Sequence, residues 1–328
     1  MAGWPRSFMG KPTPDPKDSS KARGCVLAAS LALSLLSGAL SAQEPSPLLA
    51  YAQELSYPTI PHERERFARL QEAEYVLQRN PPPEENCAQT LGAQRFADIY
   101  EELGIARSRT GDHDGAAEAF TKALECSPRN PRLHASLAVD LSAQGRNDEA
   151  REVLERGAAI DPDHHGVRKV QGRVAFVQGR WADAIMYLRL AALQSPDLKD
   201  SMFRQILLWL AQRRAGIRHP GLADREITVD WPGPIIDTLN GTITEAELLG
   251  IIQDENDETR RREMLTEALF YIGQLRLAEG QRETARRHFA AVMNLKVVSF
   301  VEYDMARAEL AKMRASEAKA APNPQGRS

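Results

Sequence analysis

A repeat of 34 residues, present three times in succession, constrains the fold of this chain more than any other feature. Three residue types recur at that spacing: Gly111, Gly145 and Gly179; Ala116, Ala150 and Ala184; Pro128, Pro162 and Pro196. Repeats of this length are typical of helix-turn-helix units that stack side by side. The sequence therefore predicts an all-α solenoid built from antiparallel helix pairs.

Each recurring residue suits one place in such a helix pair. Glycine adopts the left-handed backbone past the end of the first helix, and proline stops the second helix. Small residues let the two helices approach closely, and larger ones fill the core: Gly104, Ala138 and Gly172, then Phe120, Leu154 and Leu188. The pattern resembles the tetratricopeptide repeat, with units over 97–130, 131–164 and 165–198. This resemblance implies a tetratricopeptide-repeat superhelix over 97–198.

Residues 43–96 precede the repeats and are predicted to hold a leader and an N-terminal capping helix. Proline and serine are scattered through 43–61, which predicts an extended leader. Residues 62–79 are rich in helix formers and end before a run of three prolines. One stripe of this helix carries Phe67, Leu70, Ala73 and Leu77. We expect it to cover the apolar end of the solenoid.

The 34-residue register fails over residues 199–265, which are predicted to be a degenerate repeat helix (199–216) and an irregular insert (217–262). The insert contains Trp231-Pro232-Gly233-Pro234 and a turn at Asn240-Gly241. Thr244 and Glu247 predict a capping box for a short helix over 245–252.

Beyond the insert, residues 266–313 are predicted to form a C-terminal repeat (266–299) and a capping helix (300–313). Residues 314–328 are small and polar, so they are predicted to be a disordered tail.

The first 42 residues have the order of a secretory signal peptide. A basic stretch ending at Arg23 precedes an apolar run from Cys25 to Leu40, and small residues follow at Ser41 and Ala42. The alternative is a retained membrane anchor, but this run is short for a span. No other apolar stretch is long enough to cross a membrane. We expect cleavage after Ser41 or Ala42 and a periplasmic or secreted protein.

Cleavage would leave Cys87 and Cys126 as the two cysteines of the mature chain. Cysteine pairs in oxidising compartments favour disulfides. Cys126 ends the second helix of the first repeat and Cys87 precedes its first helix, so both belong to the same edge of the pair. A disulfide is the preferred interpretation, and two separate thiols are the alternative.

Composition and motifs argue against nucleic-acid binding and catalysis. The net charge of −3 gives no overall attraction to nucleic acid. The basic runs Arg260-Arg261-Arg262 and Arg286-Arg287-His288 have acidic neighbours and no interleaved aromatic residues, as a solvated face would. His113-Asp114 and residues 161–165 are interpreted as turn residues rather than metal ligands. We expect a protein that is not an enzyme, with no cofactor and no metal site.

The resemblance to tetratricopeptide repeats also implies a concave binding wall formed by the first helix of each unit. Its predicted partner-binding residues are Ile105, Arg109, Arg132, Val139, Lys169, Arg173 and Phe176. Lys169 and Arg173 lie one helical turn apart beside Phe176, which suits an acidic or amphipathic segment of a partner. The alternative is that these two cations only solvate the groove.

The order of three repeats, a Trp-Pro interruption and a final repeat resembles the NlpI-type periplasmic repeat lipoproteins. That resemblance implies an adaptor for cell-envelope enzymes, including peptidoglycan hydrolases and a periplasmic protease. Members of that family carry a lipidated N-terminal cysteine, which cleavage after residue 42 would not leave here. The leading hypothesis is an exported scaffold that binds envelope proteins. The alternative is a self-associating structural subunit of an envelope assembly, held as a homodimer through its end helices.

Overall fold

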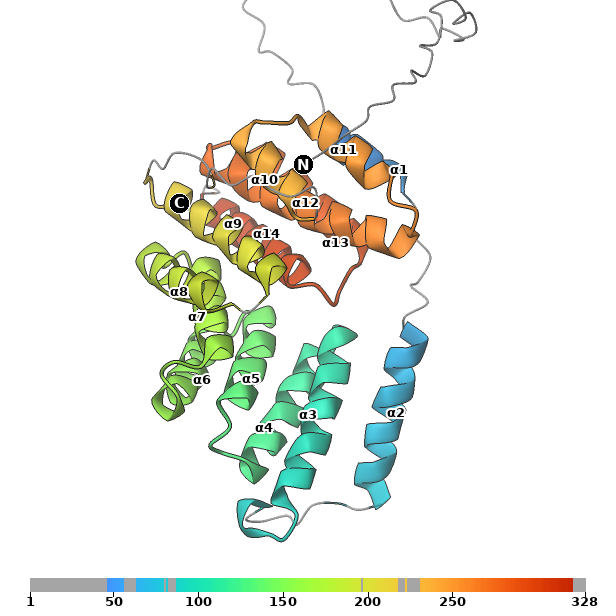
Figure 1. Ribbon diagram of the computed structural model, residues 1–328, viewed down its shortest axis with the longest axis vertical. Helices are drawn as coiled ribbons and strands as arrows, with labels where there is room; N and C mark the ends of the chain where they lie inside the picture. Colours follow the sequence, from blue (N-terminus) through green and yellow to red (C-terminus); the bar gives the residue numbers. More distant parts are fainter. Residues whose placement is uncertain are drawn as a thin grey trace, which may run out of the picture. The chain divides into compact units, whose positions relative to one another are not determined.

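The computed structural model describes residues 46–55, 63–79, 81, 87–195, 197–217, 222 and 231–320. The chain divides into two compact units, Met1–Glu44 and Pro45–Ser328, and every described residue belongs to the second. The regular structure of the described residues is entirely helical, and Figure 1 shows the helices in chain order. The predicted signal segment 1–42 lies outside the described residues.

Three antiparallel helix pairs form the predicted repeats. The pairs are α3 (Ala93–Arg109) with α4 (His113–Cys126), α5 (Pro131–Ala143) with α6 (Asn147–Ile160), and α7 (His165–Gln178) with α8 (Trp181–Gln194). Gly111, Gly145 and Gly179 connect the helices within the pairs with φ angles of 83°, 82° and 74°. These are the left-handed conformations that glycine adopts without strain. The fold is therefore the predicted all-α tetratricopeptide-repeat solenoid.

Two helices precede the repeats. α2 (Glu63–Arg79) packs against α3 and buries Ala73, as predicted for the capping helix. The extended leader predicted for 43–61 is wrong over α1 (Pro47–Glu54), where Leu48, Leu49 and Ala52 are buried. Eight residues are too few to form a stable helix alone, so tertiary packing holds α1 in place. Its sequence is too short to reveal a helical period.

The region after the third repeat contains more helices than predicted. α9 (Leu198–Arg214) packs against α8 and α12 (Glu258–Ala278), and α12 pairs with α13 (Arg282–Leu295). The insert holds α10 (Gly233–Asn240) and α11 (Glu245–Gln253), so it is not irregular throughout. The capping box of Thr244 and Glu247 at the start of α11 is confirmed. α1 packs against α11, α12 and α13, and lies beside α11 in Figure 1.

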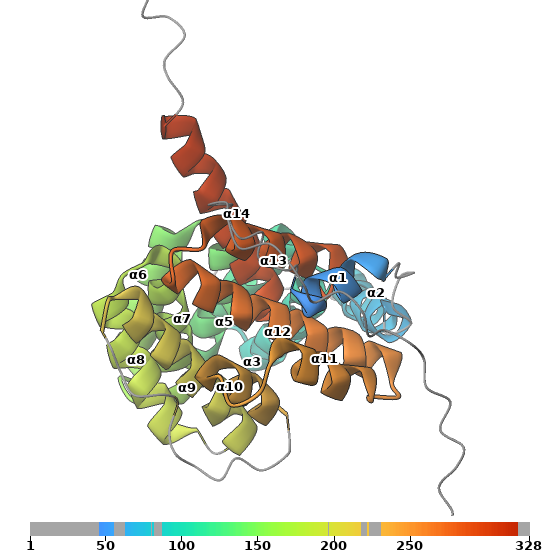
Figure 2. The same cartoon turned by 90° about the horizontal axis from the view of Figure 1, so that it is seen from above.

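The last helix, α14 (Val301–Ala320), is longer than predicted. The disordered tail predicted for 314–328 is wrong over 314–320, and residues 321–328 lie outside the described residues. Alanine, glutamate and lysine favour helix in this segment. Arg282 of α13 donates hydrogen bonds to Ser316 and to the carbonyl oxygen of Met313, and Arg286 pairs with Glu317. In Figure 2, α14 extends beyond the neighbouring helices.

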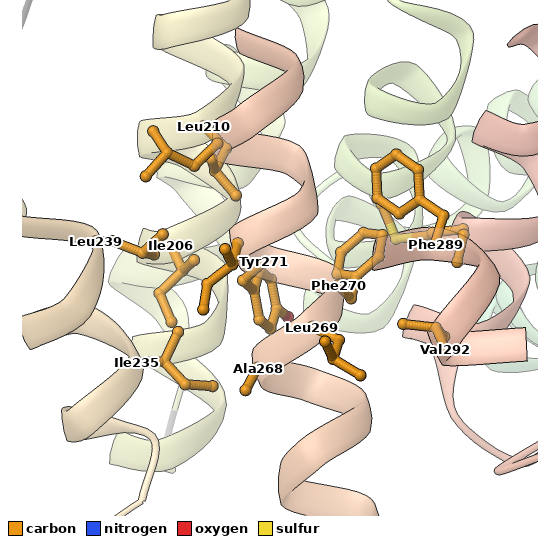
Figure 3. Close-up of a cluster of buried hydrophobic side chains, with 14 of the residues drawn as sticks. Ile206, Leu210, Ile235, Leu239, Ala268, Leu269, Phe270, Tyr271, Phe289 and Val292 are labelled. Atoms are coloured by element: carbon orange, nitrogen blue, oxygen red, sulfur yellow. The ribbon is translucent and has the colours of Figure 1, made fainter. Parts of the chain in front are cut away.

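Two hydrophobic clusters account for most of the buried apolar residues. One joins the first two repeats to α2 and to part of α7. The other runs from the third repeat through α1 and α9–α14. Figure 3 shows part of the second cluster, with Ile206 and Leu210 of α9 facing Tyr271 of α12, while Phe289 lies near Phe270. The last repeat is therefore continuous with the third repeat through α9.

A disulfide joins Cys87 to Cys126, with Cα atoms 4.6 Å apart. Cys87 begins a short 3-10 helix, η1 (Cys87–Gln89), ahead of α3, and Cys126 ends α4. The bond therefore ties the segment before the first repeat to the end of its second helix. No helix among the described residues is long and apolar enough to cross a membrane.

Candidate partner-binding surfaces

The predicted groove residues fall into three places. Ile105 and Arg109 of α3 line a cavity of about 400 Å³ together with α2. The apolar residues of this cavity are Ala73 and Val76 from α2, and Ile99, Ile105 and Ala106 from α3. Glu72, Glu102 and Arg109 supply its charged groups. This is the part of the predicted wall with room for a side chain from another molecule.

Comparison between repeats explains why this cavity is open. Ile99 is half-buried, whereas its equivalents one and two repeats later, Leu133 and Val167, are 0% and 1% exposed. In the second and third repeats, the first helices α5 and α7 pack directly against each other. α2 occupies the place of a preceding second helix, and the described chain has no matching first helix beside α3. The cavity is therefore the vacant first-helix position at the N-terminal end of the solenoid.

The middle of the predicted wall is partly used within the chain. Arg132 remains exposed and donates a hydrogen bond of 2.7 Å to Glu101 of α3. Burial raises the pKa of Glu101 above its ordinary value, and the positive charge of Arg132 opposes that rise. Val139 is half-buried and packs against the core of the first two repeats. Arg132 is thus accessible, while Val139 contributes mainly to the interior.

The C-terminal end of the wall lies against α14, which packs on α5 and α7. Lys169 forms a 3.0 Å ion pair with Asp200 of α9, and burial lowers the pKa of Lys169 to about 8. Burial also lowers the pKa of Arg173, and Glu302 and Asp304 of α14 oppose this shift. The acidic segment that faces these cations therefore belongs to the chain itself. The repeat pattern could not predict this contact, because α14 lies far from α7 in the sequence.

Phe176 was predicted to line the groove, but it is 0% exposed. Its ring packs edge-on against Trp181, with centroids 5.5 Å apart. The placement on the groove surface is therefore wrong. Trp181 begins α8 directly after the Gly179 turn, so it brings a large aromatic ring back onto α7. The repeat register alone does not show this local packing.

His113 was interpreted as a turn residue, yet it is 7% exposed and bridges two helices. Its Nδ1 lies 2.7 Å from Asp140 of α5, and its Nε2 lies 3.3 Å from Asp304 of α14. Burial lowers the pKa of His113, but hydrogen bonds to both aspartates outweigh that effect and raise it to about 9. Arg307 adds a 2.9 Å hydrogen bond to the carbonyl oxygen of Ala143. These contacts fasten α14 to the first two repeats.

The Trp-Pro interruption has a structural role on α12. The indole N–H of Trp231 donates a hydrogen bond to Glu267. Burial and the nearby Glu302 raise the pKa of Glu267 to about 8. The Tyr271 hydroxyl donates a 2.8 Å hydrogen bond to Glu302. This buried polar cluster holds the insert, α12 and α14 together.

The described residues contain no group of three or more His, Cys, Asp or Glu side chains arranged to hold a metal ion. His164 of the sequence cluster at 161–165 instead caps α7, where its Nδ1 accepts a hydrogen bond from the N–H of Val167. Asp161 likewise accepts a hydrogen bond from the backbone N–H of Asp163. Both are the local contacts expected of turn residues.

A comparison with protein families agrees with the helix-pair architecture over part of the chain. Residues 109–174 match a family described as tetratricopeptide repeat. Among solved structures, the chain is similar to one titled "Crystal structure of MamA protein", at 19% identity and a TM-score of 0.33. That match covers 62% of this chain and 92% of the other. The segment 109–174, which spans the α4–α6 helices and most of α7, thus consists of tetratricopeptide repeats.

Proposed function

We propose that this chain is an exported, non-enzymatic scaffold that binds partner proteins through the N-terminal half of its repeat wall. Solenoids of this kind offer extended surfaces to other proteins. Binding two proteins side by side raises their effective concentration without any chemistry by the scaffold.

The vacant first-helix position between α2 and α3 is the observation that carries the proposal. Its floor is apolar, and two predicted groove residues, Ile105 and Arg109, line it. An amphipathic helix from a partner would bury Ile99 as the preceding repeat buries Leu133 and Val167. The C-terminal end of the wall is less available, because α14 already packs against α7.

Two features support a cell-envelope location. The order of charges, apolar residues and small residues in the first 42 positions is that of an export signal. The disulfide between Cys87 and Cys126 suits an oxidising compartment. With the resemblance to NlpI-type adaptors, these features support peptidoglycan hydrolases or a periplasmic protease as the partners.

An exposed apolar stripe favours the second candidate, a self-associating structural subunit, with the contact on α8 rather than on the end helices expected from the sequence. Met186, Leu190 and Leu193 lie along one face of this helix and are 47%, 37% and 79% exposed. A homodimer pairing this stripe with itself would use an isologous contact. In this alternative the protein would be recovered without an enzyme partner.

Affinity capture from a cell-envelope extract separates the two candidates. We expect the purified chain to retain a hydrolase or protease in stoichiometric amount, and the variant Ile105→Asp/Arg109→Glu to lose it. Arg129→Glu, a charge change at an exposed turn after α4, is the matched control and should retain the partner. Recovery of the chain alone, as a dimer in sedimentation, would support the structural subunit. Undiminished capture by the double variant would contradict the placement at α3.

A further inference from the structure

A second groove lies between α4 and α6, with α5 as its floor. It encloses about 1210 Å³, and none of its lining residues belongs to the cavity between α2 and α3. Its floor consists of the buried side chains His134, Leu137 and Leu141 of α5, and the buried Val153 of α6 adjoins them. The volume exceeds the range of roughly 300–1,000 Å³ that is usual for small-molecule sites. A segment of another protein is therefore a better match in size.

The walls of this groove carry an excess of acidic groups. Its acidic residues are Asp114, Glu118 and Glu125 from α4, and Glu149 and Glu152 from α6. Two of its three basic residues are engaged: Arg146 with Glu149, and Lys122 over the Tyr100 ring. Within the described chain, no ion pair involves Glu118, Glu125 or Glu152. The charge that is left outside these contacts is therefore mainly negative, and Arg156 is the remaining basic residue of the groove.

The repeat register shows that these acids are not a general property of second helices. Glu118 corresponds to Glu152 one repeat later and to Met186 two repeats later. Glu125 corresponds to Ala159 and then to Leu193. The equivalent positions on α8 are therefore apolar, although they occupy the same helix face in the same fold. The groove between α4 and α6 therefore has acidic residues on both walls, whereas the positions on α8 equivalent to Glu118 and Glu125 carry none.

Helical walls also limit the conformation of an occupant. The backbone N–H and C=O groups of α4, α5 and α6 are paired inside their own helices, so they offer no edge to an extended strand. A bound helix would satisfy its own backbone groups and present side chains alone. His134 donates its Nδ1–H to the carbonyl of Asn130 at 3.0 Å, which leaves Nε2 as an acceptor on the floor.

We propose that the groove between α4 and α6 binds a cationic amphipathic helix of a partner protein. The apolar face of that helix covers Leu137, Leu141 and Val153, and its lysine or arginine side chains meet Glu118, Glu125 and Glu152. This surface is separate from the cavity at α3, so one scaffold molecule has two docking places with different charge preferences.

A labelled model peptide tests this proposal directly. The probe is a 16-residue helix with leucine on one face and lysine on the other, and its binding is followed by fluorescence anisotropy. We expect Glu118→Lys/Glu125→Lys to weaken binding about tenfold or more, which corresponds to about 1.4 kcal/mol. Rising salt should weaken binding to the unmodified protein. A photoreactive group on the probe should label α4 or α6.

Control variants define the results that would refute this proposal. Glu54→Lys/Glu258→Lys makes the same charge change at exposed acids outside the groove, and should alter binding less than twofold. An equal loss of binding in this control variant would show that only the net charge of the protein matters. Equal affinity for a peptide with glutamate in place of lysine would refute the role of the acidic walls. Loss of binding on Ile105→Asp would assign the peptide to the α3 cavity instead. Glu118→Gln/Glu125→Gln, which only neutralises the charges, provides the test if the reversed variant does not fold.

Discussion

Gly104 on α3 lies directly against the ring of Phe120 on α4, so the first helix pair depends on the absence of a side chain there. A Cβ atom at residue 104 would be 2.8 Å from the nearest ring carbon. Phe120 is 2% exposed and has little room to move. Direct contact between the two helices therefore requires a small residue at position 104.

We predict that Gly104→Ala lowers the free energy of unfolding by about 1–3 kcal/mol, because overpacking outweighs the higher helix propensity of alanine. Gly250→Ala is the matched control, since Gly250 lies in α11 with no atom near its Cβ position. That variant should gain up to about 1 kcal/mol. Urea unfolding of both proteins measures the difference, and equal effects would contradict the steric explanation.

A second residue-scale prediction concerns His113. Its pKa is raised from 6.5 to about 9 in the folded state. The stability that it contributes is therefore fully present below pH 6.5 and is lost as the pH rises through about 9. A shift of this size corresponds to on the order of 3 kcal/mol. Urea unfolding at pH 6 and pH 10 should show a larger pH-dependent loss in the unmodified protein than in His113→Gln. Identical pH dependence would contradict the bridge to Asp140 and Asp304.

At the scale of elements, α1 shows how a short helix can be stable only through its neighbours. Leu48 is 0% exposed where α1 meets the last repeat. We predict that Leu48→Ala costs about 2–5 kcal/mol in the free energy of unfolding. Leu91→Ala is the control, because Leu91 is fully exposed in the turn before α3. Its cost should stay within about 0.5 kcal/mol, and a similarly small cost at Leu48 would place α1 away from this core.

Sequence reasoning succeeded for elements whose signals are local. The recurring glycine, alanine and proline residues predicted the three helix pairs, and Thr244 with Glu247 predicted the start of α11. It failed where a contact joins distant segments. The packing of α14 on α5 and α7 determines the surroundings of Lys169 and Arg173, although α14 lies more than a hundred residues further along the chain. The burial of Phe176 under Trp181 was missed because the repeat register does not resolve side-chain packing at the turn.

At the scale of the whole molecule, the disulfide adds a covalent cross-link between the segment before α3 and the end of α4. It closes a loop of 39 residues. Loops of that size are stabilised by about 2–4 kcal/mol when cross-linked. We predict that Cys87→Ser/Cys126→Ser loses stability of that order in thermal or urea unfolding.

Thiol labelling under denaturing conditions checks the same bond. The full-length chain has three cysteines, so one should react without reductant and three after reduction. Removal of residues 1–42 at export would also remove Cys25. The mature protein would then have no reactive cysteine without reductant and two after reduction. Labelling of both Cys87 and Cys126 without reductant would contradict the pairing.

The docking of α1 on α11–α13 determines where any attachment at the N-terminus leaves the folded body. Ser46 at the start of α1 lies beside the last repeat rather than beside α3, although α3 is much nearer in sequence. A tag fused directly ahead of Ser46 would therefore be attached next to the C-terminal repeat. A tether joined to the end of α14 at Ala320 would leave from the opposite terminus of the chain, so the choice of tag position is itself a probe of which surfaces partners use.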